Sequence, residues 1–552
     1  MKNISRILAL VLVVIMVTAC GTAGGGGGAA APAEPAAPGQ PAAAPADGVD
    51  NFNPFGYPIV NERITLNGWG SRGATHTVDW PEVDAFITME EITNIHIDWT
   101  LVPPDGVHEA RNLAFASGDL PDFFIRAGGI SVMDQINFGA AGMLIPLNDL
   151  IYNYAYNFRA RAVEHPHILR GITLPDGNIF SMPQAMTLDV PTISQKFWMN
   201  MTWIENLGLE VPNTLDEITA VLKAFRDGDP NQNGDYNDEI PYSDVNSGNS
   251  LIWSTAAAFG MGGLGNTGKS VWLDRTADGE VRFVGLVPEF KDQMMYLNNW
   301  WEEGLIDPEI FTHGSPEFTA KANQNLIGAK FNNDNNQQLA AYHANFDTIR
   351  APIGIDGTRR FTRIGAGVTN GTFVITSANQ FPRETMRWVD FFYSYEGARL
   401  IRIGREGLSF DIVDGVYVIH ERLMHCPEGL SPSQAMSPYA IAFAGGGMPE
   451  FIHPNSEHAR LPPLAAQWHA YLMQDLVPGL VVPQFLFTAE EQNELHPISS
   501  DILSFMEEMR SAFITGARGF DEWDDFITQL ERMNVHRFVE IYQDAVDRWI
   551  ES

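Results

Sequence analysis

Basic residues and cysteines are both scarce in this sequence. The 552 residues include 34 Lys and Arg against 68 Asp and Glu, which gives a formal net charge of -34 at pH 7. A body with that charge repels phosphate backbones and anionic lipid headgroups, so nucleic acid is not an expected partner. The only cysteines are Cys20 and Cys426, and the first lies in a segment that we expect to be processed. No intramolecular disulfide is therefore predicted, and stability must come from the core or from a bound metal.

Several short motifs of enzyme active sites are also missing. The sequence has no nucleophile elbow, no His-Glu-x-x-His and no Cys-x-x-Cys. Its 14 His are scattered, and the closest pair, His165 and His167, has no third ligand nearby in the sequence. A glycoside hydrolase needs only two carboxylates, and 68 acidic residues cannot exclude such a pair. A secreted, calcium-binding glycoside hydrolase therefore stays open as an alternative.

The N-terminus has the layout of a secretory signal peptide. Lys2 and Arg6 precede an apolar run over residues 7–17, which is too short to span a bilayer comfortably. The run ends in Val-Thr-Ala-Cys-Gly, which resembles a bacterial lipobox. The resemblance implies that residues 1–19 are removed and that the thiol of Cys20 is acylated, which anchors the protein in the outer leaflet. An ordinary membrane anchor is the alternative.

Gly, Ala and Pro dominate the segment that follows. Residues 21–50 contain no aromatic residue and no apolar periodicity, so they cannot bury enough surface to offset the entropy of ordering. We therefore assign residues 20–58 to the lipidated cysteine and a disordered tether. Such a tether holds a folded body away from the membrane.

Strand and helix patterns alternate along the body, which is typical of α/β layers with a largely parallel sheet. About 490 residues follow Pro58, enough for two or three domains. The patterns in the first part predict strands at residues 63–69, 94–102 and 122–126 and helices at residues 81–93 and about 107–116. A Pro-Asp-Gly turn signal between apolar runs predicts a hairpin over residues 172–180.

The remaining patterns predict a second lobe and a return to the first. A strand near residues 192–198 would begin the second lobe, and a helix at 215–226 has Thr214 as N-cap and Glu217 at the capping-box position. The other predicted elements are a strand at 326–331, a helix at 289–303, a strand at 368–376, a helix at 382–393 and an almost wholly helical tail at 488–550. The expected lobes are residues 59–186 plus about 350–405, and residues 187–349 plus about 406–552.

Six short stretches of the body, spread in order over most of the chain, carry a family resemblance. They are residues 120–122 (Leu-Pro-Asp), 172–183, 203–212, 304–309, 513–516 and 521–524. Together they resemble the family 1 extracellular solute-binding proteins, in particular their large, LplA-like, oligosaccharide-binding lipoproteins. Each stretch is weak alone, and the order of the set makes the resemblance fairly specific.

The resemblance implies a fold, a function and partners. The implied fold is α/β, with two lobes of the type II periplasmic-binding-protein kind, a hinge and an added helical C-terminal region. The implied function is that of a non-enzymatic, substrate-binding lipoprotein of an ABC importer, which captures an oligosaccharide or other carbohydrate between its lobes and delivers it to permease subunits. We expect a monomer on the extracytoplasmic face of a bacterial membrane. A surface adhesin is a further alternative.

An oxygen-rich loop follows the helix predicted at residues 215–226. Oxygen side chains at alternate positions, with a Gly at the sharp turn, suit a structural calcium ion. The candidate ligands are Asp229, Asn231, Asn233, Asp235, Asn237, Asp238 and Glu239. Either Asp238 or Glu239 would be the closing carboxylate. The loop is one residue longer than is usual in the family that it resembles, so either Asn237 or Asp238 could be the ligand at that point. Ile240 stands at the twelfth position, so the loop is not a true EF-hand, and an acidic surface turn without metal is the alternative.

Sugar recognition needs flat apolar faces and a few convergent polar groups. In open α/β sheets such groups lie beyond the carboxyl ends of the strands. Positions of that kind give the candidate ligand-binding set Trp69, Ser71, Arg72, Arg126, Gln184, Trp198, Trp253, Asn332, Asp334 and Glu406. Because the chain has 13 Trp, packing in the core is the competing role for each tryptophan.

Overall fold

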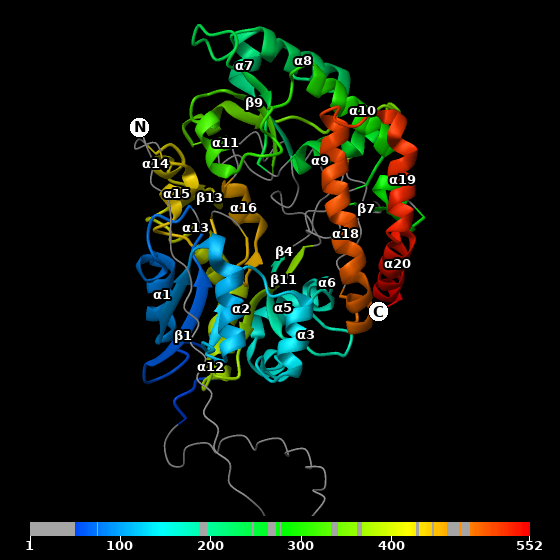
Figure 1. Ribbon diagram of the computed structural model, residues 1–552. Helices are drawn as coiled ribbons and strands as arrows, with labels where there is room; N and C mark the ends of the chain where they lie inside the picture. Colours follow the sequence, from blue (N-terminus) through cyan, green and yellow to red (C-terminus); the bar gives the residue numbers. More distant parts are fainter. Residues whose placement is uncertain are drawn as a thin grey trace, which may run out of the picture. The chain divides into compact units, whose positions relative to one another are not determined.

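The computed structural model describes most of the chain from Asp50 to Glu551 (Figure 1). The exceptions are residues 74, 187–195, 246–247, 263–271, 277, 333–339, 362–366, 427–429, 444–445, 461–473 and 476–485. The expected signal peptide, Cys20, the tether up to Val49 and Asp334 lie outside the described residues. Among the helices that the structure does describe, none combines the length and the apolar character that a membrane span requires.

A six-stranded sheet organises one part of the fold, with the strand order β14-β4-β11-β3-β1-β2. Its strands are β1 (Ile64–Ser71), β2 (Ile95–Val102), β3 (Phe123–Ile125), β4 (Ser181–Met186), β11 (Val368–Ile375) and β14 (Phe451–Ile452). β1 runs parallel to both β2 and β3, and β11 runs antiparallel to β3 and β4. The carboxyl ends of β1 and β3 therefore lie at the same edge of this sheet.

Both faces of this sheet are buried, because successive strand residues point to opposite sides. Phe123 and Phe373 belong to one core cluster, whereas their neighbours Phe124 and Val374 belong to another. The helices that accompany this sheet along the chain are α1 (Asp84–Thr93), α2 (Val107–Ser117), α3 (Val132–Ala140), α4 (Asn148–Tyr154), α5 (Tyr156–Glu164), α6 (His167–Arg170), α12 (Pro382–Asp390), α13 (Tyr395–Ile403), α14 (Glu421–Met424), α15 (Pro432–Met436) and α16 (Pro454–Arg460). A small hairpin, β12 (Phe410–Val413) and β13 (Val416–Ile419), follows α13.

A four-stranded sheet with the order β10-β5-β9-β6 organises the other part. Its strands are β5 (Lys196–Asn200), β6 (Ile240–Tyr242), β9 (Ile327–Asn332) and β10 (Phe346–Thr348). β6 and β9 are parallel, and β5 runs antiparallel to β9 and β10. The elements that follow these strands along the chain are α7 (Met201–Asn206), α8 (Leu215–Asp227), α9 (Asn249–Ala256), α10 (Pro288–Glu302), α11 (Ser315–Ala322) and the hairpin β7 (Leu273–Arg275) and β8 (Val281–Phe283).

Three C-terminal helices complete the core of this second part. They are α18 (Ala489–Ile514), α19 (Trp523–Arg532) and α20 (Val535–Glu551). Met506, Phe513 and Phe538 from these helices share one core cluster with Phe225 and Leu297, and α18 packs against α10 and α20 (Figure 1). The predicted helical tail is confirmed, and it is an integral part of the core.

Most of the predicted elements are confirmed within a few residues, including the strands at 63–69 and 94–102. The capping box of α8 is confirmed as well, because Thr214 Oγ1 accepts a hydrogen bond from the Glu217 amide at 3.1 Å and Glu217 Oε2 accepts one from the Thr214 amide at 3.2 Å. The Glu217 carboxylate and the Thr214 hydroxyl together satisfy two amides that no helical carbonyl can reach.

The hairpin predicted at residues 172–180 is wrong. The Leu174 amide donates to the Asn178 carbonyl at 2.9 Å, and the Asn178 amide donates to Asp176 Oδ1 at 2.9 Å. This closes a tight turn without strands, and β4 begins only at Ser181. Ile179 and Phe180 pack into two different core clusters, so burial and not strand pairing explains the apolar residues after the turn.

The chain passes between the two sheets three times: before β5, between β10 and β11, and between β14 and α18. The α/β class is confirmed by these sheets and their helices. The exact lobe boundaries stay a prediction, and one segment differs from the expected division. Phe451 and Ile452 pair with β4 of the six-stranded sheet, although we expected residues after about 406 in the second lobe.

If the C-terminal helices complete the second core, removing a buried ring from α18 must destabilise the whole protein. We expect Phe513→Ala, which empties a fully buried site, to lower the free energy of unfolding by about 3 to 5 kcal/mol. The matched control Phe55→Ala removes a ring that is 72% exposed and should cost about 0.5 kcal/mol or less. Urea unfolding of both variants measures the difference, and equal losses would contradict the prediction.

Candidate functional site

The oxygen-rich loop folds around its own side chains directly after α8. The Asp229 carboxylate accepts hydrogen bonds from the amides of Asn233 and Gly234, each at 3.1 Å. Asn231 Oδ1 also accepts from the Asn233 amide at 3.0 Å, and Asn233 Oδ1 accepts from the Asp235 amide at 2.7 Å. Gly234 adopts φ 89°, which permits the sharp turn. The backbone thus holds the oxygen side chains of alternate residues on the inside of one short loop.

Glu239 is the carboxylate of this loop that lacks a partner. Both of its oxygens are shielded from water and have no hydrogen-bond partner among the described residues. Burial, reinforced by the carboxylates of Asp238, Asp229 and Asp235, raises the pKa of Glu239 to about 7. Asp238 instead accepts a hydrogen bond from Asn233 Nδ2 at 2.7 Å. A buried carboxylate that lies near three others fits a hard cation, because a divalent ion would neutralise their charges.

A second acidic group, formed by Asp307, Glu309 and His313, also has metal-ligand spacing. Here an ammonium group already supplies the positive charge. Lys321 Nζ lies 2.9 and 2.8 Å from the two oxygens of Asp307 and 2.7 Å from Glu309 Oε2. Burial alone would raise the pKa of Asp307, but hydrogen bonds from Lys321 and Ser243 hold that pKa below its usual value. The group is thus an internal ion pair, and the 229–239 loop is the better cation site.

The carboxyl edge of the six-stranded sheet carries a buried polar cluster built around Arg126, one residue after β3. Arg126 adopts φ 52°, a left-handed conformation that is uncommon for residues other than glycine. Its Nη1 donates to the Ile441 carbonyl at 3.3 Å, and the His76 Nε2 lies 3.1 Å from the same oxygen. Burial lowers the pKa of His76 to about 4, and the charge of Arg126 contributes to that shift, so His76 is neutral at pH 7.

Gln184 extends this cluster from β4. Its Nε2 donates to Glu450 Oε1 at 2.9 Å, and Arg402 Nη2 donates to the same oxygen at 2.7 Å. A Cβ on Gly446 would lie 2.7 Å from Gln184 Oε1, so a side chain at this position would displace the Gln184 amide. The structure therefore brings together the predicted residues Arg126 and Gln184, and it adds His76, Arg402 and Glu450, which sequence reasoning missed.

The carboxyl edge of the four-stranded sheet is also polar. Asp244 follows β6 and accepts a hydrogen bond from the Tyr242 hydroxyl at 3.1 Å. Two buried lysines, Lys196 and Lys330, lie on neighbouring strands near the end of β9. Asn332 is the last residue of β9 and pairs in register with Lys196. The structure describes its backbone but not its side chain. Trp253 lies on α9, nearly buried in the core cluster of this part.

The other predicted ligand-binding residues lie partly in the core and partly on the surface. Trp69 and Trp198 are buried in core clusters, which is the packing role expected for most tryptophans. Ser71 is buried at the end of β1, whereas Arg72 is exposed and forms an ion pair with Asp79 at 2.6 Å. Glu406 lies exposed in the turn before β12. The structure does not bring Glu406 into either polar edge through any contact among the described residues.

One further motif bears on the question of enzymatic activity. Residues 263–270 read Gly-Leu-Gly-Asn-Thr-Gly-Lys-Ser, which matches the spacing of a phosphate-binding loop. A working loop of that kind connects a strand to the helix that follows it. The described elements on either side are the short helix Ala257–Phe259 and the strand β7, and residues 263–270 themselves lie outside the described residues.

Comparison with known proteins gives consistent matches. The family profile described as bacterial extracellular solute-binding protein matches residues 79–399. The fructooligosaccharide ABC transporter substrate-binding protein FusA of Streptococcus pneumoniae is 30% identical over 483 residues, which cover 84% of this chain and 86% of that protein.

Solved structures of FusA match the fold of this chain. The S. pneumoniae protein in complex with kestose has a TM-score of 0.74 at 27% identity, covering 88% of this chain and 100% of that one. An EF-hand mutant of FusA in complex with fructo-nystose has a TM-score of 0.73 at 26% identity, with the same coverage. The two-lobe α/β fold expected from the sequence is confirmed.

The ion pair of Asp307 and Lys321 predicts a pH-dependent stability. Lys321→Met leaves a buried carboxylate uncompensated, and we expect a loss of about 3 to 5 kcal/mol at pH 7. Because the pKa of Asp307 is depressed, its stabilising contribution exists above the unfolded pKa and disappears as the pH falls. The difference between the wild type and Lys321→Met should therefore shrink below about pH 4. Denaturant unfolding at pH 7 and pH 3.5 measures it, and a loss independent of pH would contradict the ion-pair interpretation.

Proposed function

The chain belongs to the family of bacterial extracellular solute-binding proteins, and on this basis we propose that it captures a neutral oligosaccharide for an ABC importer. A substrate-binding role in ABC import follows from the family and from the similarity to FusA. Its relatives are transport proteins, and we propose that this chain likewise binds its cargo without chemical change. The nature of the cargo is argued from the two polar sheet edges.

The observation that carries the proposal is the pair of polar edges, one at the carboxyl ends of the strands of each sheet. Ligands of open α/β sheets bind at such edges. Arg126 and Gln184 supply donors on one edge, and Asp244 with the two buried lysines supplies polar groups on the other. The three connections between the sheets would act as the hinge, and cargo would shift an equilibrium between open and closed forms.

The charge pattern favours a neutral sugar over a polyuronate. Arg72 forms an ion pair with Asp79, and the Arg402 guanidinium is paired with Glu450. The negative charge of Glu450 also favours the protonated form of Arg126. Each of these cations at the carboxyl edge of the six-stranded sheet therefore has an acidic neighbour. The chain as a whole carries a net charge of -34, so long-range electrostatics disfavour anionic glycans.

We propose that the 229–239 loop holds a structural calcium ion. Asp229, Asn231 and Asn233 would supply side-chain oxygens, and Glu239 is the better closing ligand because its oxygens have no other partner among the described residues. Asp235, Asn237 and Asp238 complete the proposed set. The ion would neutralise converging carboxylates and fix the segment between α8 and β6, and its role would be structural.

Family membership assigns the protein to the extracytoplasmic side of the membrane. We propose that Cys20 carries the lipid and that residues 20–58 tether the body, as the lipobox-like sequence indicates. A monomer that meets permease subunits from the outer leaflet fits this arrangement. Palmitate labelling of the wild type and of Cys20→Ala tests the anchor, since the label should be lost only in the variant.

The cargo proposal predicts a measurable preference among glycans. Kestose should bind the full-length protein, whereas trigalacturonate should bind at least about tenfold more weakly, because the net charge of -34 repels its carboxylates. Arg126→Gln should weaken kestose binding by at least about tenfold, because a donor at the carboxyl edge is lost. Isothermal titration calorimetry measures both effects, with Arg537→Gln on α20 as the control. Tighter binding of trigalacturonate, or slow cleavage of kestose, would overturn the proposal.

The calcium proposal predicts opposite effects of one substitution with and without the metal. In chelator at pH 8, Glu239→Gln should raise the melting temperature, because the wild type must ionise a carboxyl whose pKa is raised to about 7 in the fold. With calcium, the wild type should gain stability and the variant should gain clearly less. The exposed Glu210→Gln serves as the control in thermal-shift measurements. If calcium raised the melting temperatures of the wild type, Glu239→Gln and Glu210→Gln equally, Glu239 would not be a ligand.

A further inference from the structure

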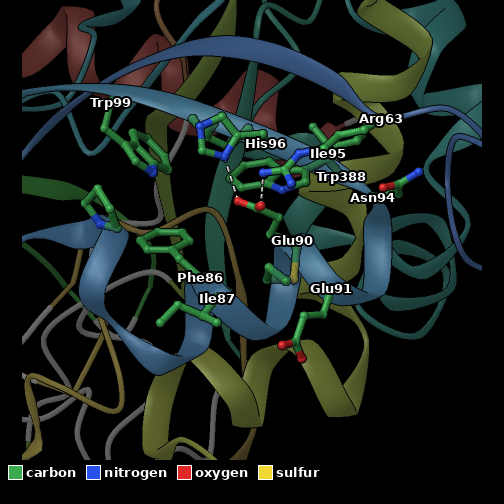
Figure 2. Close-up of a pocket in the computed structure, with 13 residues that line it drawn as sticks. Arg63, Phe86, Ile87, Glu90, Glu91, Asn94, Ile95, His96, Trp99 and Trp388 are labelled. Carbon is green, nitrogen blue, oxygen red and sulfur yellow. Dashed lines mark hydrogen bonds and ion pairs between the residues drawn. The ribbon is translucent and has the colours of Figure 1, made fainter.

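A separate pocket lies at the other end of the six-stranded sheet, away from the carboxyl edge (Figure 2). Its volume is about 370 Å³, and it lies where α1, the edge strand β2 and α12 meet. Arg63, which lines the pocket, directly precedes β1, and Ile95 is the first residue of β2. Arg126 and Ser71 follow the carboxyl ends of β3 and β1, so this pocket is distinct from the proposed cargo site.

Rigid aromatic rings form one wall of the pocket. The Trp99 ring lies edge-on to Trp80 at 4.8 Å between centroids and to Phe123 at 5.8 Å. It is also tilted against Phe86 at 5.1 Å and Trp388 at 6.4 Å. These contacts fix the orientation of the half-buried indole, as Figure 2 shows for Trp99 and Phe86. A flat apolar ligand face could pack on this wall without reordering side chains.

Polar groups converge at the opposite end of the pocket. Glu90 Oε2 lies 2.7 Å from His96 Nδ1, and Glu90 Oε1 pairs with Arg63 (Figure 2). The three side chains are between 34% and 55% exposed, so the remaining polar nitrogens of Arg63 and His96 can reach a bound molecule. Asn94 also lines the pocket, although its amide nitrogen donates to the carbonyls of Val60 and Asn61. The pocket therefore combines an apolar wall with several fixed hydrogen-bonding groups.

The charges of this lining favour a neutral ligand. Glu90 and Glu91 outnumber Arg63, and both oxygens of Glu90 are already engaged. A ligand that suits the pocket has one flat apolar face, several hydroxyl groups and no negative charge. A sugar ring has these properties, and the volume falls within the roughly 300 to 1,000 Å³ of small-molecule sites.

We propose that this pocket is a second carbohydrate site, which binds one neutral sugar unit weakly on the outer edge of β2. The inference does not depend on cargo binding between the sheets, because none of its residues belongs to the polar edges described above. A second, weak site would retain glycan at the surface of the protein and raise the local sugar concentration.

Fluorine NMR of the full-length protein labelled with 5-fluorotryptophan tests the proposal with kestose as the probe. The Trp99 resonance is assigned from its absence in Trp99→Phe, and the Trp388 resonance from Trp388→Phe, so either variant gives a reporter if the other does not fold. We expect a saturable shift of these resonances with kestose and no shift with galacturonate. Calorimetry in parallel measures binding at the cargo site.

Two matched variants separate direct binding from a transmitted change. Ile87 lines the pocket and is 46% exposed, so Ile87→Arg should obstruct the pocket mouth and abolish the shift without disturbing the core. Leu113→Arg, at an aliphatic residue on α2 that is 69% exposed, should leave the shift unchanged. Resonances that do not move while calorimetry shows binding would overturn this site alone. A shift that persists in Ile87→Arg would also overturn it, because the change would then arise elsewhere.

Discussion

The neutralisation of buried carboxylates is the constraint on which the rest of this structure depends. With twice as many acidic as basic residues, the chain must give each buried acid a cation or backbone amides. Asp307 is paired with Lys321, Glu450 with Arg402, and Asp274 with Arg282. Asp390 accepts the amides of Asn157 and Phe158 at the start of α5, although burial still raises its pKa to about 6. In the 229–239 loop, by contrast, Glu239 has no hydrogen-bond partner among the described residues and lies close to three other carboxylates, which is why we propose an external cation there.

The same constraint shapes the proposed cargo site. The Arg402 guanidinium and the Gln184 amide meet on one carboxylate oxygen of Glu450, so the cations at the carboxyl edge are largely compensated before any ligand binds. Such an edge offers hydrogen bonds with little net charge, which suits hydroxyl groups better than carboxylates. The C-terminal helices contribute differently, because Met506 and Phe513 of α18 belong to the core cluster that also contains Phe197 and Phe331 of the four-stranded sheet.

Local patterns were reliable where the deciding interactions are short-range. The capping box of α8 spans residues 214–217, so it could be recognised without tertiary information. The ligand spacing of the 229–239 loop is equally local, and calcium binding there stays a prediction. The hairpin expected at residues 172–180 failed because a Pro-Asp-Gly turn closes equally well between segments that are buried without pairing. Trp69 and Trp198 could not be assigned from position alone, since burial in a core depends on which sheet face the neighbouring elements cover.

The sequence by itself determined the acidic balance and predicted the α/β layering that the structure confirms, because these depend on composition and on residues that are close in the chain. The export signal and the calcium ligands rest on equally local patterns and stay predictions. Only the tertiary structure decided which polar groups meet. Gln184 and Glu450 are 266 positions apart, and His76 reaches a carbonyl 365 positions away, so no local pattern could predict the cluster at the carboxyl edge. It also decided that Lys321 and not a metal neutralises Asp307, because a fold that closes long loops can place an ammonium group where a cation would otherwise bind.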